Sequence, residues 1–140
     1  MSAKPFFLDT NILIYANTSQ DETKKAIAQR LVTSGEAMTS VQTLNEFCNV
    51  LRRKFPQKFT EVDAILQDIQ MDVDVVPLTA NMTHQAVAIS KRFLLSFYDS
   101  LILAAASEYG CSAVLSEDLQ SGFKLETGLV IINPFMKVAE

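Results

Sequence analysis

The stretch FFLDTNILIYA, residues 6–16, places one carboxylate between two apolar runs. The apolar residues before Asp9 predict a short buried strand over residues 6–9, and Thr10 is the expected N-cap of the helical turn that follows. A charge between two buried elements is unfavourable unless the group is paired, protonated or bound to a metal ion. We therefore expect Asp9 to have a specific chemical role.

Short apolar segments alternate with segments of helical periodicity along the rest of the chain. We expect further strands at residues 37–39, 73–78, 113–115 and 130–132, and helices over about 22–34, 60–70 and 98–109, with two more that open after Ser40 and at Thr79. The strands are wholly apolar and hairpin signals are absent, which indicates a parallel sheet covered by helices on both faces. The predicted fold is a three-layer α/β/α sandwich with a short, Rossmann-like parallel sheet.

The composition is that of one globular domain over residues 1–140, with 49% hydrophobic and 20% charged residues. Two cysteines cannot build a disulfide framework, and Cys48 falls in an apolar helical stripe, so we expect a buried free thiol in a reducing cytoplasm. No signal peptide precedes the first strand, and no apolar run is long enough to span a bilayer. We expect a cytoplasmic protein that does not contact membranes.

The formal net charge of −4 argues against a protein held on nucleic acid by a broad basic face. It leaves room for an enzyme that meets a phosphate backbone through metal ions, because these ions bring their own positive charge.

Acidic residues follow two of the predicted strands. Asp9 ends the first strand, and Glu117 and Asp118 follow the strand at residues 113–115. Ligands of an open parallel sheet bind beyond the carboxyl ends of its strands. These carboxylates therefore fall at the expected active-site edge.

Two more acids lie beside or within apolar helical segments. Taken singly, Glu46 has the simpler interpretation of a solvated flank residue, and Asp99 that of an acid that complements the helix dipole. Together with Asp9 and Asp118, they would repel one another by about 4 kcal/mol per close pair at an effective dielectric constant near 20. A divalent cation relieves this repulsion, and oxygen ligands without a Cys or His cluster select Mg²⁺ or Mn²⁺. We therefore expect these four acids to hold a metal ion.

Four motifs come in the order and context of the PIN domain: DTNILIYA (9–16), SVQTLNEF (40–47), YDSLILAAA (98–106) and LSEDLQSG (115–122). The resemblance is strongest to the VapC-type toxins of bacterial toxin–antitoxin pairs, and it extends from Phe6 to about Pro134. It implies an Mg²⁺- or Mn²⁺-dependent endoribonuclease with an RNA substrate and a cognate antitoxin protein as partner.

The resemblance also assigns residues. The family's acidic positions map onto Asp9, Glu46, Asp99 and Asp118, and its small polar positions onto Asn11 and Ser116, with Thr10 as a further supporting residue. Asp118 matches the family position within LSEDL, and whether its neighbour Glu117 shares metal or water contacts stays open. The only histidine, His84, is expected far from the strand ends and is interpreted as structural.

The basic residues have two interpretations. They fall in two groups, Arg52, Arg53 and Lys54 after the Glu46 helix, and Lys91 and Arg92 before Asp99. Each group is either a solvated helix end that complements the dipole or part of a rim that guides RNA toward the acids. The family resemblance also implies a homodimer, as does an apolar helical stripe that one small domain is not expected to cover fully: Val62, Ile65, Leu66 and Ile69.

Other classes of protein fit less well. A phosphatase of the haloacid dehalogenase type needs a second Asp where Asn11 stands and a later lysine that LSEDL lacks, and a receiver domain fails similarly. A non-catalytic PIN-domain protein that processes or binds RNA is the remaining alternative. The presence of all four acids argues against it.

Overall fold

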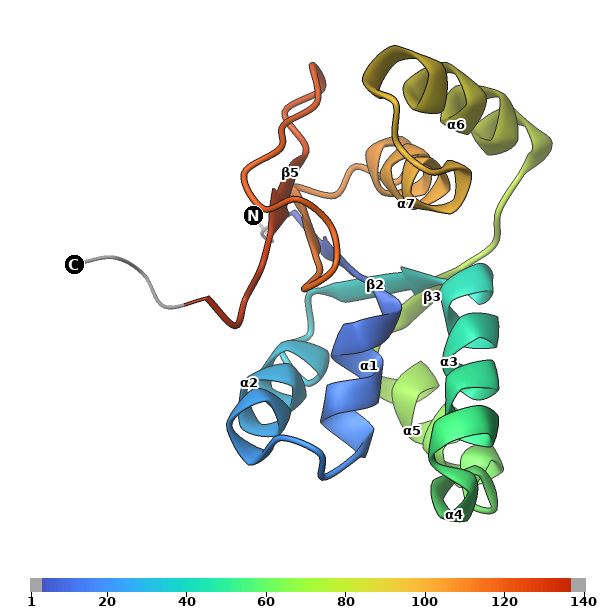
Figure 1. Ribbon diagram of the computed structural model, residues 1–140, viewed down its shortest axis with the longest axis vertical. Helices are drawn as coiled ribbons and strands as arrows, with labels where there is room; N and C mark the ends of the chain where they lie inside the picture. The colour runs from blue at the N-terminus through green and yellow to red at the C-terminus, as the bar shows by residue number, and fades with distance from the viewer. Residues whose placement is uncertain (1–3, 137–140) are drawn as a thin grey trace.

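The computed structural model describes residues 4–136, and a five-stranded sheet forms its middle layer (Figure 1). The strands are β1 (Phe6–Leu8), β2 (Ala37–Ser40), β3 (Asp74–Val76), β4 (Ala113–Leu115) and β5 (Val130–Ile132). Their order is β3-β2-β1-β4-β5, and every neighbouring pair is parallel. The predicted α/β class and parallel sheet are confirmed.

Helices cover both faces of this sheet (Figure 1). On one face lie α6 (Ala80–Phe93) and α7 (Phe97–Glu108), and on the other α1 (Thr10–Asn17), α2 (Glu22–Val32), α3 (Val41–Lys54) and α5 (Val62–Asp72), with the short α4 (Pro56–Phe59) after α3. In the described part of the chain, no helix is both long and apolar enough to cross a membrane.

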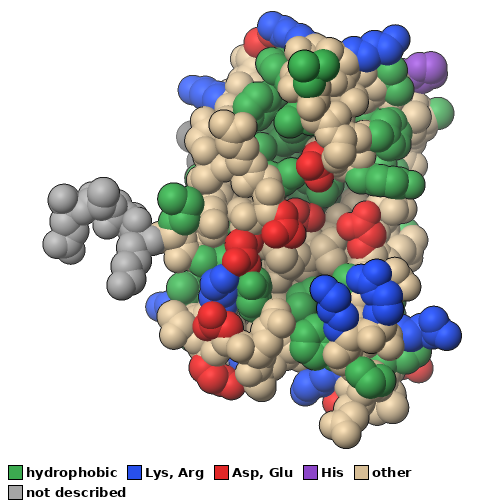
Figure 2. Space-filling model, in the orientation of Figure 1, with side chains coloured by type: hydrophobic (Ala, Val, Ile, Leu, Met, Phe, Trp, Pro, Cys, Tyr) green, Lys and Arg blue, Asp and Glu red, His purple; other side chains and the backbone are tan. Residues whose placement is uncertain are grey.

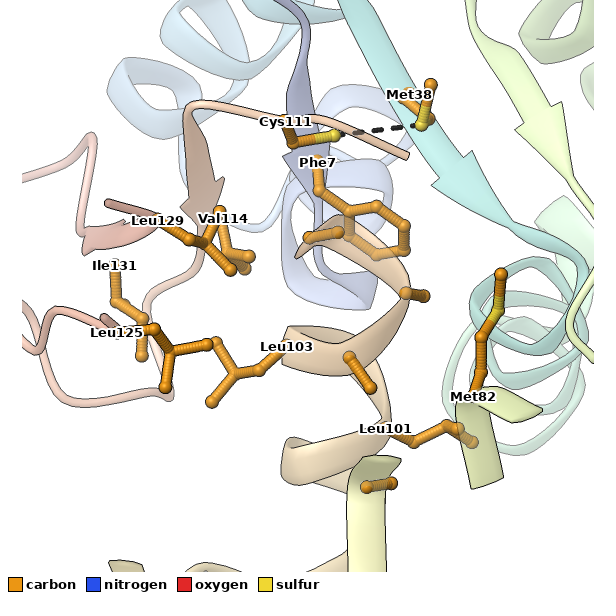
Figure 3. Packing of buried hydrophobic residues seen from close by; sticks show 14 of the residues in the cluster. Phe7, Met38, Met82, Leu101, Leu103, Cys111, Val114, Leu125, Leu129 and Ile131 are labelled. Atoms are coloured by element: carbon orange, nitrogen blue, oxygen red, sulfur yellow. Dashed lines mark hydrogen bonds between the residues drawn. The ribbon is translucent and has the colours of Figure 1, made fainter. Parts of the chain in front are cut away.

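The alternation of side chains along β1 produces two cores. Phe7 packs toward α6 and α7, whereas the next residue, Leu8, packs toward α1, α2 and α3, and both are fully buried. Figure 3 shows the first core, in which Phe7 and Val114 of the sheet lie beside the α7 residue Leu103. Burial of each such side chain contributes about 1.5–3 kcal/mol, so strands of only three residues are held firmly.

The strand order reverses direction at β1. The chain runs from β1 through β2 to β3 on one side, and then returns to β4 and β5 on the other side. The strand order changes direction between the neighbouring strands β1 and β4. Such a point leaves a crevice at the carboxyl ends of the two strands. Residues that follow β1 and β4 therefore meet.

Two local predictions need correction. Asp9, not Thr10, is the N-cap of α1: its backbone is extended, and its carboxylate accepts a 2.7 Å hydrogen bond from the Thr10 N–H, while Thr10 already belongs to the helix. Ser40 is confirmed as the cap of α3, and the helix expected to open at Thr79 begins at Ala80 with Thr79 as its N-cap. The helix expected over 60–70 runs from Val62 to Asp72, and the single turn α4 was not predicted.

The apolar stripe of α5 faces the core but is covered only in part. Ile69 is 2% exposed, and Val62, Ile65 and Leu66 are partly buried against the core under α1, α2 and α3. The stripe faces the helix's own domain because the core on that side of the sheet requires a fourth helix. Three residues of the stripe are thus incompletely covered by this domain, and the homodimer stays a prediction.

Candidate active site

A cleft of about 610 Å³ opens at the carboxyl ends of β1 and β4. Each predicted acidic ligand lines it, and each comes from a different element: Asp9 after β1, Glu46 from α3, Asp99 from the first turn of α7 and Asp118 after β4. Figure 2 shows acidic side chains across the middle of this face, with Lys and Arg side chains below them. Residues 109 positions apart in the chain thus share one hollow.

Asp9 lies at the floor of the cleft and is 7% exposed. Besides the Thr10 N–H, its carboxylate accepts a 2.7 Å hydrogen bond from the Ser116 hydroxyl and a longer one, 3.4 Å, from Asn11 Nδ2. Burial raises the pKa of Asp9, and the nearby charges of Asp118 and Glu46 raise it further, against the opposite effect of its hydrogen bonds. Asp9 is the acid whose charge the fold solvates least.

Asn11 connects the two loops that form the cleft floor. Its Nδ2 lies 3.3 Å from Ser116 Oγ and 3.2 Å from Asp118 Oδ2, and its Oδ1 accepts a hydrogen bond from the Glu117 N–H. Ser116 Oγ in turn accepts from the N–H of Asp118. Both small polar residues are thereby placed between Asp9 and Asp118.

Thr10 joins α1 to α3, because its hydroxyl donates a 2.9 Å hydrogen bond to Glu46 Oε2. Glu46 precedes the fully buried Phe47 and is itself half-buried at the cleft wall. It is therefore not the solvated flank residue of the simpler interpretation.

Asp99 lies at the opposite wall, in the first turn of α7. The N-cap of this helix is Ser96, whose Oγ accepts a 3.2 Å hydrogen bond from the Asp99 N–H. The capping hydrogen bond thus comes from Ser96, so the carboxylate of Asp99 can face the cleft while it also complements the helix dipole.

The four acids have no cationic partner among the described residues. The two ion pairs within residues 4–136 are Lys24–Glu117 and Arg92–Glu126. The oxygen donors fit a hard cation such as Mg²⁺ or Mn²⁺. Within the same range, however, no three acidic, Cys or His side chains converge on one point, so joint coordination requires rotation of less buried side chains such as Asp118 and Glu46.

The basic groups are separated by the fold. Arg53 and Lys54, at the carboxyl end of α3, line the cleft, and Arg52 is their exposed neighbour. Arg92 instead lines a separate hollow between α6, α7 and residues 125–127, where it pairs with Glu126, and Lys91 lies next to it on α6. Of these five basic residues, Arg53 and Lys54 thus lie at the cleft, on its α3 side, and the choice between a solvated helix end and an RNA-guiding rim stays a prediction.

Several cleft residues were not predicted. Tyr15, Asn49 and Tyr98 line the cleft, and Lys24 of α2 reaches Glu117 with an Nζ–Oε1 distance of 2.5 Å. For Tyr98, the sequence did offer a signal, because Tyr98 directly precedes the predicted ligand Asp99. For Lys24 no signal exists, because its partner is 93 residues away. His84 is exposed on α6 and does not line the cleft.

Comparisons with known proteins identify the family of this chain. The family model of the PIN domain matches residues 6–124. No curated protein sequence matches the chain.

Solved structures share the fold at low sequence identity. VapC20 of Mycobacterium tuberculosis, a toxin that cleaves the sarcin–ricin loop, has a TM-score of 0.65 and 23% identity, over 78% of this chain and 86% of its own. A toxin–antitoxin complex from Klebsiella pneumoniae has a TM-score of 0.69 and 16% identity, over 92% and 97%. FitAcB from Neisseria gonorrhoeae has a TM-score of 0.67 and 19% identity, over 93% and 98%. At these identities the likeness shows a common fold.

Proposed function

Because this chain belongs to the PIN domain family, we propose that it is an Mg²⁺- or Mn²⁺-dependent endoribonuclease and the toxin of a toxin–antitoxin pair. The observation that carries the proposal is the meeting of four acids from four separate elements in one cleft, none of them in an ion pair with a described residue. In a cluster of acids without a function, all side chains would be expected to be solvent-exposed, whereas Asp9 is buried.

In this proposal Asp9, Glu46, Asp99 and Asp118 hold the metal. When bound, a divalent ion lowers the pKa of a coordinated water molecule and offsets charge on a phosphodiester. Asp9 supplies the fixed carboxylate, because the fold restrains it through Ser116 and Thr10.

Asn11 and Thr10 are positioning residues in the proposal. Asn11 restrains Asp118, and Thr10 restrains Glu46, each through one side-chain hydrogen bond. These two acids are less buried than Asp9 and need the restraint more. The alternative role of Glu117 is less favoured, because Lys24 already pairs with it.

RNA is the proposed substrate. Arg53 and Lys54 lie on the cleft wall that α3 forms, where they can contact phosphate groups next to the scissile bond. Two cations beside a strongly acidic floor favour local positioning of a strand and not broad electrostatic binding, which agrees with the net charge of −4.

An antitoxin and a second copy of the chain are the proposed protein partners. Support comes from the fold shared with VapC20 and with a toxin–antitoxin complex. An antitoxin would lay an apolar segment in a groove near the cleft and present a basic side chain to the acids. Restored ribonuclease activity after removal of such a partner would support this role.

The proposal is tested by incubating the purified protein with RNA in Mg²⁺, Mn²⁺, Ca²⁺ or EDTA. We expect cleavage within the chain of the RNA in Mg²⁺ or Mn²⁺ and none in EDTA. Equal cleavage in EDTA would contradict the metal dependence. Binding of RNA without cleavage in any metal would favour the non-catalytic alternative.

A further inference from the structure

Lys24 does not line the acidic cleft, in contrast to Arg53 and Lys54, but its side chain reaches residues that do. Its Nζ lies 2.5 Å from Glu117 Oε1 and 3.3 Å from the Tyr15 hydroxyl. Glu117 and Tyr15 do line the cleft. Lys24 therefore stands behind the cleft wall and reaches two of its members.

Aromatic rings hold Lys24 in this position. Its Nζ lies 4.9 Å from the ring centre of Tyr15 and 5.5 Å from that of Phe135, and these two rings pack edge to face at 5.1 Å. A lysine ammonium over aromatic faces gains cation–π attraction. The ion pair is only 27% exposed on each side chain, so water screens it less than a surface pair.

The charge states of the two partners agree with this arrangement. The hydrogen bond to Glu117 raises the pKa of Lys24. Burial acts to raise the pKa of Glu117, but the contacts with Lys24 and Tyr15 together outweigh it, so the pKa lies below its ordinary value. Both groups are therefore charged near neutral pH.

Glu117 also shares a loop with Asp118. Its N–H donates to Asn11 Oδ1, while Asn11 Nδ2 donates to Asp118. Asn11 thus links the backbone of Glu117 to the carboxylate of Asp118.

We propose that Lys24 is a positioning residue that neutralises Glu117 and holds it at the wall of the cleft, which leaves Asp9, Glu46, Asp99 and Asp118 as the carboxylates that face a bound cation. The proposal deepens the metal-dependent function above and rests on it. Without Lys24, a fifth negative charge would stand unpaired next to Asp118. With Lys24 but without the Glu117 carboxylate, an unpaired positive charge would stand there instead.

The test is a double-mutant cycle of Lys24→Met and Glu117→Gln, read by calorimetric titration with Mg²⁺ and by thermal melting in EDTA. Lys25→Met is the matched control, because Lys25 is on the same helix and its side chain forms a hydrogen bond only with Ser19 among the described residues. Lys24→Arg keeps the charge and should behave as the parent protein.

We expect Mg²⁺ to bind roughly threefold more tightly to Lys24→Met, because the negative charge of Glu117 is then no longer neutralised. It should bind roughly threefold more weakly to Glu117→Gln, because the positive charge of Lys24 is then unpaired, and solvent screening keeps both effects small. The double variant should bind Mg²⁺ as the parent does. In EDTA, Lys24→Met should melt below Lys25→Met, and the added Glu117→Gln change should raise its melting temperature.

Two results would overturn the proposal. Lys24→Met could match Lys25→Met in both measurements, or the double variant could match Lys24→Met, in which case Lys24 acts by packing on the rings and not through Glu117. If the parent binds neither Mg²⁺ nor Mn²⁺, the metal-dependent function fails, and melting in EDTA still decides whether Lys24 acts through Glu117.

Discussion

Asn11 Nδ2 lies 3.2 Å from Asp118 Oδ2, which links the first turn of α1 to the loop that follows β4, 107 positions later. The same amide group reaches Ser116 and, at 3.4 Å, Asp9. One side chain thereby spans the crevice where the sheet changes direction. The arrangement of the acids depends on this span as much as on the acids themselves.

The first prediction concerns Asn11→Ala. The change removes the hydrogen bonds of Asn11 to the Glu117 N–H and to the Asp118 carboxylate, and the longest of the three that Asp9 accepts. We therefore expect the free energy of unfolding to fall by about 1–3 kcal/mol, and ribonuclease activity to fall at least about tenfold. Urea unfolding and RNA cleavage measure the two effects. Asn17→Ala is the control, because Asn17 is also on α1 but its side chain bonds only the Leu13 carbonyl within residues 4–136. Equal activity of the two variants would contradict the role of Asn11.

The second prediction concerns pH. The pKa of Asp9 is raised above 3.8 in the folded protein by burial. The folded chain therefore binds more protons than the unfolded chain, and Asp9 destabilises the metal-free protein increasingly as pH rises through the interval above 3.8. In EDTA, Asp9→Asn should be more stable than the parent at pH 7.5, and the difference should shrink toward pH 4.

The control for this pH prediction is Asp63→Asn, because Asp63 is exposed on α5. It should show no such trend. An Asp9→Asn variant that is less stable than the parent at both pH values would mean that lost hydrogen bonds outweigh the removed charge.

The third prediction concerns Asp99→Asn. Because Ser96 supplies the capping hydrogen bond, loss of the Asp99 charge should raise, or leave unchanged, the melting temperature in EDTA, and should reduce the increase that Mg²⁺ produces. Thermal melting with and without Mg²⁺ at pH 7.5 measures both, with Asp72→Asn as an exposed control. A lower melting temperature of Asp99→Asn in EDTA would show that its interaction with the helix dipole dominates.

The fourth prediction separates the two basic groups. In an inactive Asp9→Asn background, Arg53→Gln with Lys54→Gln should weaken binding of single-stranded RNA and reduce the salt-dependence slope by about 0.7 for each lost phosphate contact. Lys91→Gln with Arg92→Gln removes the same charge away from the cleft and should change binding little. Filter binding at several salt concentrations measures the slopes. Equal losses in both pairs would indicate a general charge effect.

Much of the fold could be predicted from the sequence, because the apolar strands and the helical periodicity are local signals. β4 and β5 have the predicted bounds, and the cap Ser40 was found from residue type. The turn α4 was missed because four residues after Pro56 carry too little periodicity. The orientation of α5 could not be predicted, since the width of the core below the sheet is a tertiary property.

The candidate site was predictable where topology alone positions a residue. Asp9 and Asp118 follow neighbouring parallel strands, so they meet in any fold of this class. The cluster around Lys24 was not predictable, because the contact to Glu117 depends on how α2 lies against α1. The position of Arg92 was not predictable either, because it depends on how α6 packs against α7. Arg92 precedes Asp99 by seven positions but lines a different hollow.

The most direct test of the central claim is RNA cleavage by Asp9→Asn in Mg²⁺, beside a circular dichroism spectrum of the same preparation. The account predicts a native spectrum and a loss of at least about a hundredfold in cleavage rate, since a carboxylate that holds the metal is replaced by a neutral amide of the same size. Cleavage at the rate of the parent protein would contradict the account, because Asp9 would then not hold the metal ion.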